Sequence, residues 1–502
     1  MPDLILAVDC STTSAKAVVW TSDGQAVSEG RSSLDLSIPA VGQGEQNPVQ
    51  WREAAEIAIA AVLEGVDVSA LRALCFTHQR EGFACLDDSG AAIRPAMLWL
   101  DTRATREVQM FGTTEVHRMT GKPANPTPAY YKLLWLKANE PETLHKTSMV
   151  VDVHAYLVWA FTGQYATSVA SADPLGLIDL ATSDWADGLL QDCGLSREQL
   201  PALHQPGETI GQVTVDIAKK LGLPEGLPVI SGAGDGQCAG LGAGIVEPGS
   251  AYLNLGTGLI SGSVSDNYVP SLAYRAMAGC VPGTVNYELF IGAGTFMVTW
   301  FLSTINQDSF TKSGGDQSAE EFWQAQAATI PVGSEGLIVV PYWMGALTPY
   351  WDETARGILV GFTPSHSPAH IYRAILEGIA CELRLCVEQA TPSLPQPLSE
   401  FVVMGGGATS GLWCQMIADV VGAPLVISGE QEATSLGAAM LAAVGAGLYS
   451  SVADAGKVMS SRGRRFEPRS EQTTAYDEVY EHYRAVYPAL RSTFREHYGA
   501  PA

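Results

Sequence analysis

Residues 227–236 read Leu-Pro-Val-Ile-Ser-Gly-Ala-Gly-Asp-Gly, a short apolar run followed by a glycine-rich segment that carries one carboxylate. The run at 228–230 predicts a short buried strand. The small residues at 231–236 predict a tight turn, because glycine adopts turn conformations without a steric penalty. Asp235 would then project above the edge of a sheet. An aspartate between glycines is most often only a turn former, so its meaning depends on the rest of the chain.

Two hairpins of one design begin the two halves of the chain. Residues 4–20 and 251–264 each read as a strand, a turn of small polar residues and a second strand. This similarity suggests a duplicated domain. The Pro-Gly pair at 248–249 places the boundary between an N-terminal domain of residues 1–248 and a C-terminal domain of residues 249–502. Strands alternate with helical patterns along the chain, which predicts an α/β fold.

Three segments carry helix signals. Residues 48–63 begin with proline and continue with an apolar pattern, and Ser367 followed by proline predicts the start of a second helix. That helix carries isoleucine or leucine at every fourth position from 371 to 383, which is typical of a buried helical face. From Tyr476 onward the sequence predicts a polar terminal helix.

The composition limits the partners. The chain of 502 residues has 53 acidic and 29 basic side chains, a formal net charge of −24. A surface of that sign repels nucleic acids and anionic membranes, so we expect neither as a partner. The small-apolar stretch at 436–448 is shorter than the ~18 residues of a membrane-spanning helix. Nine scattered cysteines without a C-x-x-C pair predict neither a zinc cage nor a disulfide framework, and fit a reduced, cytoplasmic setting.

The two common nucleotide fingerprints, the Walker A loop and G-x-G-x-x-G after a first strand, are absent from the sequence. Three other turns of small residues follow predicted strands, and such turns expose backbone N–H groups that bind anions. Each alone is most often a plain turn. Together they predict an ATP site in which two turns clamp the phosphates and a third admits adenine. The candidate residues are Ser11, Thr12, Thr13, Lys16, Gly256, Thr257, Gly258, Gly405, Gly406, Gly407 and Ala408.

A second group of residues fits an alcohol acceptor. Phosphoryl transfer to a hydroxyl needs a base and a metal, which makes Asp235 the candidate base and Asp9 and Asp235 the candidate residues for Mg²⁺. An adjacent arginine and glutamate can donate to and accept from neighbouring hydroxyls, and an indole can stack on a sugar face. The alternatives are a surface ion pair, a structural histidine and a core tryptophan. The candidate substrate residues are His78, Gln79, Arg80, Glu81, Trp99 and Asp235.

These segments together resemble the FGGY carbohydrate kinases. Residues 9–19 are similar to the first phosphate loop of that family, 234–237 to its catalytic Gly-Asp segment, and 256–258 to its second phosphate loop. Residues 341–358, 361–377 and 405–419 resemble its C-terminal signatures. The resemblance implies two actin/hexokinase-like (ribonuclease H-like) ATPase domains around a central cleft, with ATP, Mg²⁺ and a small sugar or polyol between them. It also implies a homodimer, and Asp235 as the base.

The substrate signals are mixed. Gln79-Arg80-Glu81 resembles the version of glycerol kinases and autoinducer-2 kinases, whereas the C-terminal half is more similar to xylulose kinases. Ser11 stands where the family usually has glycine. We expect phosphorylation of a pentulose such as xylulose, with glycerol, another polyol or the autoinducer-2 precursor as alternatives. Readings of other classes are an actin-like ATPase that acts on a protein partner and a non-catalytic sugar sensor.

Overall fold

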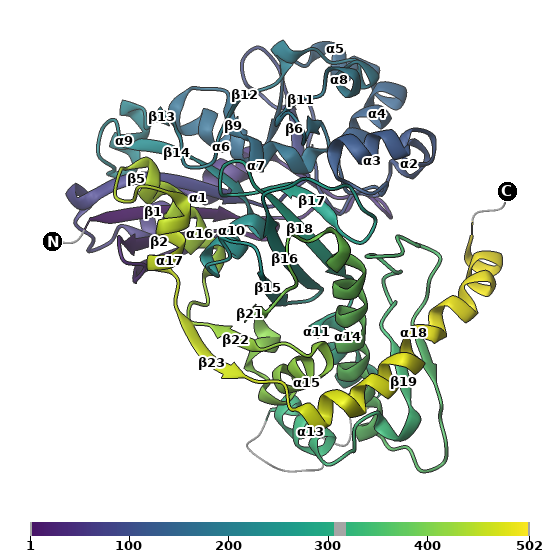
Figure 1. Cartoon of the computed structure of the whole chain (residues 1–502). Helices are drawn as coiled ribbons and strands as arrows, with labels where there is room; N and C mark the ends of the chain where they lie inside the picture. The colour runs from purple at the N-terminus through teal and green to yellow at the C-terminus, as the bar shows by residue number, and fades with distance from the viewer. Residues whose placement is uncertain (1–2, 306–317, 500–502) are drawn as a thin grey trace.

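Two mixed β-sheets, one in each half of the chain, form the frame of the protein (Figure 1). The computed structural model describes residues 3–305 and 318–499. The first sheet has six strands. In spatial order they are β13 (Thr209–Gln212), β14 (Pro228–Gly234), β5 (Leu71–His78), β1 (Leu4–Cys10), β2 (Ser14–Thr21) and β3 (Ala26–Ser33).

The second sheet has seven strands. They are β17 (Arg275–Ala278), β18 (Val285–Ile291), β16 (Leu259–Ser265), β15 (Ser250–Leu255), β21 (Glu400–Met404), β22 (Leu425–Ser428) and β23 (Arg462–Phe466).

The two sheets share one core arrangement. In the first, β1, β2 and β3 form an antiparallel meander, and β5 and β14 continue the sheet parallel to β1. In the second, β15, β16 and β18 form the meander, and β21 and β22 run parallel to β15. This common order confirms the duplication that the two hairpins predict. Strand β17 has no counterpart in the first sheet.

Helices cover both faces of the first sheet, because successive strand residues point to opposite sides. Leu4, Leu6 and Val8 of β1 belong to one buried cluster with residues of α1 (Pro48–Val62) and α6 (Val153–Thr162). Ile5 and Ala7 face the other way, toward α10 (Asp235–Gly242) and α16 (Ala433–Gly445). Helix α16 therefore comes from the second half of the chain but packs on the sheet of the first (Figure 1).

The small-residue composition of α16 has a packing reason. A Cβ on Gly437 would lie 2.0 Å from the carbonyl oxygen of Cys238, and a Cβ on Gly242 would lie 1.9 Å from that of Ala433. The two helices thus approach backbone to backbone, which only glycine permits at these positions. Within the described ranges, no helix is long and apolar enough to cross a membrane.

In the second half, α14 (Pro368–Ala390) and α15 (Gly411–Val421) pack beneath the long C-terminal helix α18 (Ser470–Tyr498). Buried tyrosines of α18 donate hydrogen bonds to carboxylates beneath them. The pairs are Tyr476 with Glu377 at 3.1 Å, Tyr480 with Glu388 at 2.6 Å, Tyr483 with Glu382, and Tyr487 with Asp352 at 2.7 Å. Burial raises the pKa of Glu382 to about 7.

One local prediction is wrong. The sequence predicts a tight turn over 231–236, but β14 continues to Gly234 and α10 begins at Asp235. The glycines serve close approach here rather than a turn. A Cβ on Gly232 would lie 1.9 Å from the carbonyl oxygen of Phe76 on the neighbouring strand, where the register of β14 and β5 is irregular.

Candidate active site

Three strand ends of the first sheet converge on one edge. Strands β1 and β5 are parallel with Asp9 opposite Thr77, and β5 and β14 are parallel with His78 opposite Gly234. Because parallel strands end at the same edge of a sheet, Asp9, the segment from His78 to Glu81, and Asp235 come together. The sequence predictions for these residues therefore concern one place in the molecule.

Asp235 is the first residue of α10, and its side chain is 40% exposed. Its Oδ1 accepts a hydrogen bond from the Gly236 N–H at 2.7 Å and lies 3.0 Å from Nε of Arg80. The Arg80 side chain passes so close that a Cβ on Gly234 would lie 2.5 Å from its Cγ, and one on Gly236 would lie 2.9 Å from its guanidinium. The two glycines thus form a slot for Arg80, which fixes one oxygen of the carboxylate.

Arg80 and Glu81 belong to a buried ion-pair network that joins the two halves. Nη1 of Arg80 lies 2.8 Å from Oε2 of Glu288 on β18, and Nη1 of Arg275 on β17 lies 2.9 Å from Oε1 of Glu81. Arg275 also binds Glu288 through Nε at 2.6 Å. Although burial opposes ionisation, Arg275 and Arg80 hold the pKa of Glu288 at about 2. Glu81 has a φ of +61°, a strained value for a residue with a side chain.

The sequence reading missed Glu288 and Arg275. A usable signal was present, because Glu288 stands in the otherwise apolar run Tyr287-Glu-Leu-Phe-Ile291. A charged residue buried in a strand needs a partner. Its partner Arg80, however, lies 208 residues away in sequence, so local patterns could not identify the pair.

The loop Ser11–Thr13, predicted to bind phosphate, is held by a chain of side-chain hydrogen bonds. Nε1 of Trp99 donates to Oγ1 of Thr12 at 3.0 Å, and that hydroxyl donates to Oε1 of Gln79 at 3.1 Å. Oε1 of Gln46 accepts a hydrogen bond from Nε2 of Gln79 at 2.8 Å. Nε2 of Gln46 in turn donates to the carbonyl oxygen of Thr12 at 2.6 Å. Trp99 as a whole residue is 39% exposed, which leaves it surface for a ligand. Gln79 thus supports the loop, and its predicted contact with the substrate stays a prediction.

Ser11 closes the same loop. Its Oγ and its N–H both donate to the carbonyl oxygen of Ser14, at 2.8 and 2.9 Å. The serine in place of the usual glycine therefore adds a hydrogen bond across the turn. Thr13 anchors the far end, because its carbonyl accepts from Leu34 at 2.8 Å.

Two candidate residues have protein partners of their own. Lys16 lies 2.8 Å from Glu29 and 2.7 Å from Glu432, so its ammonium is already paired with two carboxylates. His78 is buried, with Nδ1 2.7 Å from the carbonyl oxygen of Gln79. Their proposed contacts with phosphate and substrate stay predictions.

The second loop predicted to bind phosphate, Gly256–Gly258, joins β15 to β16. The carbonyl of Gly256 accepts from Thr295 at 2.8 Å, and that of Thr257 accepts from Gly294 at 2.9 Å, at the start of α11 (Thr295–Thr304). The N–H and C=O groups of a trans peptide point in opposite directions. The N–H groups of Thr257 and Gly258 therefore face away from α11 and can receive an anion.

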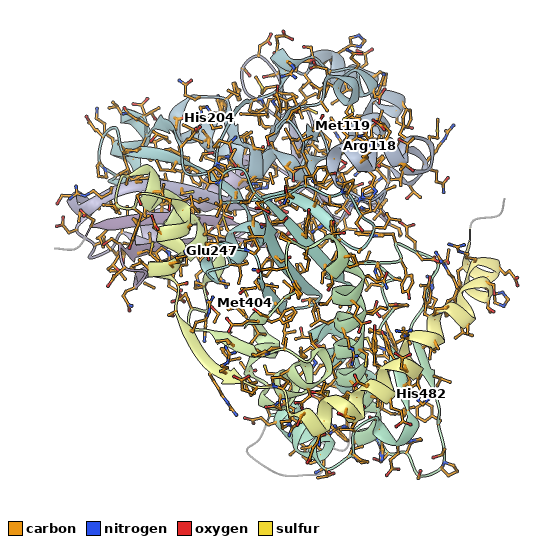
Figure 2. All side chains as sticks on the ribbon, viewed as in Figure 1. Arg118, Met119, His204, Glu247, Met404 and His482 are labelled. Atoms are coloured by element: carbon orange, nitrogen blue, oxygen red, sulfur yellow. The ribbon has the colours of Figure 1, made fainter. Side chains whose placement is uncertain are left out.

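The third loop, Gly405–Ala408, lies against the second. Strands β15 and β21 are parallel with Asn254 opposite Met404, the residue before the loop (labelled in Figure 2). Gly405 has a φ of +85°, and a Cβ on it would lie 2.4 Å from Oδ1 of Asn254. A Cβ on Gly406 would meet no atom within 4 Å. The loop thus combines one glycine needed for packing with one that borders open space.

The carboxylates of the first sheet fit a divalent cation. Oδ1 of Asp9 is buried and has no hydrogen-bond partner among residues 3–305 and 318–499. Burial, together with the Asp235 and Glu432 carboxylates, raises the pKa of Asp9 to about 8. A bound cation would favour the ionised form of Asp9 and reduce the repulsion between these carboxylates. Within the same ranges no group of three or more His, Cys, Asp or Glu side chains is arranged for a metal. Mg²⁺ commonly takes only one or two carboxylates and completes its shell with phosphate and water.

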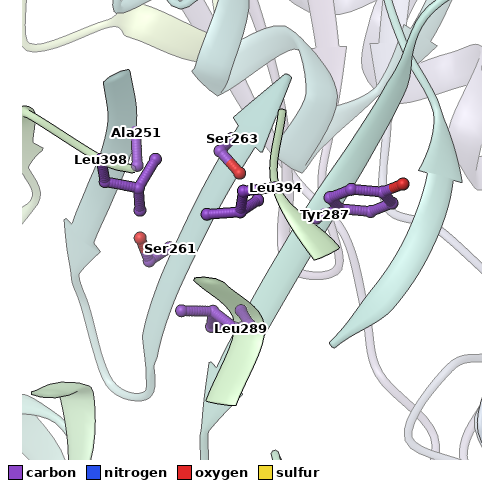
Figure 3. Close-up of a pocket in the computed structure, with 8 residues that line it drawn as sticks. Ala251, Ser261, Ser263, Tyr287, Leu289, Leu394 and Leu398 are labelled. Carbon is purple, nitrogen blue, oxygen red and sulfur yellow. The ribbon is translucent and has the colours of Figure 1, made fainter. Parts of the chain in front are cut away.

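The small cavity in Figure 3 lies apart from these residues. Its lining includes Ser261 and Ser263 of β16 and Tyr287 and Leu289 of β18. Glu288 lies between Tyr287 and Leu289, so its side chain points to the opposite face of the sheet. With a volume of about 10 Å³, the cavity has room for a single water molecule and not for a sugar.

Two sheets of one strand order, with carboxylates at the strand ends of one and glycine loops at those of the other, define a two-domain enzyme of the actin-like ATPase fold. Models of the FGGY family of carbohydrate kinases match residues 4–242 with the N-terminal domain and 251–446 with the C-terminal domain. The chain therefore belongs to the FGGY family of carbohydrate kinases, and it is an ATP-dependent carbohydrate kinase. The resemblance seen in the sequence is confirmed.

Several relatives resemble the chain over nearly its whole length. The xylulose kinase of Escherichia coli strain K12 is 30% identical over 455 residues, 88% of this chain and 90% of that protein. The autoinducer-2 kinase of Yersinia enterocolitica is 27% identical over 506 residues, 97% of this chain and 94% of that protein. The crystal structure of gluconate kinase from Lactobacillus acidophilus superposes with a TM-score of 0.92 at 25% identity, covering 99% of this chain and all of the other. Relatives named for different acceptors are thus about equally similar.

Proposed function

We propose that this kinase transfers the γ-phosphate of ATP to a hydroxyl of a small neutral sugar, a pentulose such as xylulose. The observation that carries the proposal is the setting of Asp235. One carboxylate oxygen is held by Arg80 and by the Gly236 N–H, and the partly exposed side chain leaves the other oxygen for an acceptor hydroxyl. A base held in this way can take the proton as the hydroxyl attacks.

The other candidate residues have separate tasks in this proposal. The loops at Ser11–Thr13 and Gly256–Gly258 bind the phosphates through backbone N–H groups, and Gly405–Ala408 borders the adenosine. Asp9 and Asp235 would hold Mg²⁺, which supplies positive charge to the phosphates when it is bound. Trp99 offers its exposed indole to the sugar face.

The charges around Asp235 favour a neutral acceptor. Arg80 is engaged by Asp235 and Glu288, and Arg275 by Glu81 and Glu288. To form an ion pair with Arg80 or Arg275, the carboxylate of a sugar acid would have to displace one of these protein carboxylates. We therefore place gluconate, the acceptor named for one relative, below xylulose. The autoinducer-2 precursor and glycerol remain alternatives, because Arg80-Glu81 resembles the motif of their kinases.

An ADP-release assay with purified protein, ATP and Mg²⁺ tests the proposal. The acceptors are xylulose, ribulose, glycerol, gluconate and the autoinducer-2 precursor, and the product is identified by mass spectrometry. We expect the highest kcat/KM with a pentulose. A higher value with gluconate would contradict the charge argument. ATP hydrolysis that no acceptor changes would favour an ATPase acting on a protein partner.

Two further proposals concern organisation. We propose a domain boundary at 248/249, supported by the family matches on either side of it. Limited proteolysis near Pro248 followed by mass spectrometry tests this boundary. We also propose a homodimer, which is common among FGGY kinases. Sedimentation velocity tests it, and a monomer at micromolar concentration would contradict it.

A further inference from the structure

We infer that Glu288 is a positioning residue for the acceptor site. Acting from the second sheet, it fixes the guanidinium of Arg80 so that Arg80 holds Asp235. The inference rests on the proposed function of Asp235 and goes beyond it. It makes the acceptor site dependent on a residue of the C-terminal half, although the base and the predicted substrate residues all lie in the N-terminal half.

The contacts of Arg80 give the first support. Oε2 of Glu288 accepts a hydrogen bond from Nη1 of Arg80 at 2.8 Å, and Oε1 accepts one from Nη2 at 3.3 Å. The third nitrogen of the guanidinium, Nε, lies 3.0 Å from Oδ1 of Asp235. A guanidinium is planar, so a carboxylate that grips both Nη atoms also sets the direction of Nε. The orientation of Arg80 toward the base is thereby determined from the side of Glu288.

Glu288 is itself immobilised and ionised. Arg275 donates to it through Nε at 2.6 Å, and the Tyr252 hydroxyl donates to its Oε2 at 3.2 Å. Its strand neighbour Gly262 clears the space for that tyrosine, because a Cβ there would lie 2.4 Å from the Tyr252 ring. With a side chain only 2% exposed, Glu288 has few alternatives to these contacts. It can therefore serve as a fixed reference for Arg80.

A plain interdomain ion pair is the alternative, and the protein contains a suitable control. Lys122 and Asp173, both buried, lie 2.8 Å apart in the first half and also join it to the second. Lys122 donates to the Ala276 carbonyl at 2.7 Å, and Asp173 accepts from the Ala278 N–H at 3.0 Å. These bonds reach the backbone of β17 rather than Arg80. Loss of this pair should weaken the interface without moving Arg80.

The test compares Glu288→Gln with Asp173→Asn. Each substitution keeps the side-chain shape and removes one buried charge. For Glu288→Gln we expect an acceptor KM raised about tenfold, the effect of one lost charged hydrogen bond, and an ATP KM within about twofold of wild type. For Asp173→Asn we expect a lower melting temperature but an acceptor KM within about twofold of wild type. Equal effects of the two variants on the acceptor KM would overturn the inference.

A double-mutant cycle separates action through Arg80 from independent action. If Glu288 works through Arg80, adding Glu288→Gln to Arg80→Gln should change the acceptor KM by less than about twofold. If the double variant instead shows a change in acceptor KM equal to the product of the changes in the two single variants, the inference is overturned. Tyr252→Phe, which removes a single bond to Glu288, is the milder variant if Glu288→Gln does not fold. It should raise the acceptor KM by about two- to fivefold, and an unchanged KM would count against positioning.

A crystal structure of Glu288→Gln makes the two proposals separable. If the wild-type protein phosphorylates none of the acceptors, the proposed function fails, but the position of Arg80 can still be observed. Movement of Nε away from Asp235 supports the inference. An Arg80 that keeps its 3.0 Å contact with Asp235 in this variant overturns it, whatever the kinase activity.

Discussion

The two sheets share a strand order but differ in what stands at the ends of their strands. In the first sheet these positions carry Asp9, His78 and, at the start of α10, Asp235. In the second sheet they carry the small-residue loops Gly256–Gly258 and Gly405–Ala408. The first half thus presents carboxylates beside its loop Ser11–Thr13, whereas the two loops of the second half contain no carboxylate.

This difference shows how a duplicated framework can divide the work of one reaction. Carboxylates suit a proton and a cation, whereas bare N–H groups suit phosphates, because a peptide donor carries no negative charge to repel them. The network of Arg80, Glu288, Arg275 and Glu81 joins buried charged side chains of the two halves. Each prediction below changes one side of this comparison and leaves the other intact.

The largest effect is expected from Asp235→Asn. The amide cannot take the hydroxyl proton, so kcat should fall by roughly 10²–10⁴-fold, the usual contribution of a general base. The loops of the second half are unchanged, so ATP affinity measured by calorimetry should stay close to wild type. Asp216→Asn, at an exposed position at the start of α9 (Val215–Leu221), is the control. Near-normal turnover of Asp235→Asn would remove Asp235 from the base role.

Gly406→Leu tests the second half. A side chain there enters open space, so the fold should tolerate it, but it would occupy the proposed adenosine position. We expect an ATP KM raised by about tenfold and an unchanged acceptor KM in steady-state assays, since only ground-state binding of ATP is affected. Gly188→Leu is the matched control, because its Cβ also meets no atom within 4 Å. An ATP KM equal in the two variants would place adenosine elsewhere.

Substitutions of Trp99 are expected to have smaller effects, and Trp99→Phe should affect ATP alone. It keeps an aromatic face for the sugar but loses the donor to Thr12 of the phosphate loop. One neutral hydrogen bond corresponds to an ATP KM raised by about two- to fivefold. Trp99→Ala should in addition raise the acceptor KM. If Trp99→Phe leaves the ATP KM unchanged, the indole does not support the loop.

The smallest effect concerns scaffolding in the second half. Glu382 has a folded-state pKa of about 7, above its ordinary value of 4.5, because burial disfavours its charge. Its contribution to stability is therefore full below pH 4.5 and is lost as pH rises through 7. Glu382→Gln should remove this loss. Its melting temperature minus that of wild type should increase from about pH 5 to about pH 8, with turnover unchanged. A constant difference would show that Glu382 does not titrate in this range.

Local patterns predicted much of the frame. The hairpins, the helix after Pro48 and the helix after Ser367 follow from strand alternation, capping and apolar periodicity, which act within a few residues. The segment 231–236 was misread because glycine serves equally in turns and in close packing. Only the neighbours, Phe76 and Arg80, decide between these uses.

The site was predictable in its residue types but not in its pairings. The glycine loops and Asp235 carry signals in the sequence itself. The partner of Arg80 does not, since Glu288 is 208 residues away and stands on β18 of the other sheet. The same holds for α16, whose packing on the sheet of the other half cannot be read from its own composition.

The outer strand β17 has a consequence for work with fragments of this enzyme. Its open edge is met by the other half: Gly121 accepts from the Ala276 N–H at 2.9 Å, and Lys122 and Asp173 bind further backbone groups. An uncovered strand edge is a template for pairing with another chain. The C-terminal half expressed alone would expose this edge and should self-associate, so the interface also protects the protein from aggregation.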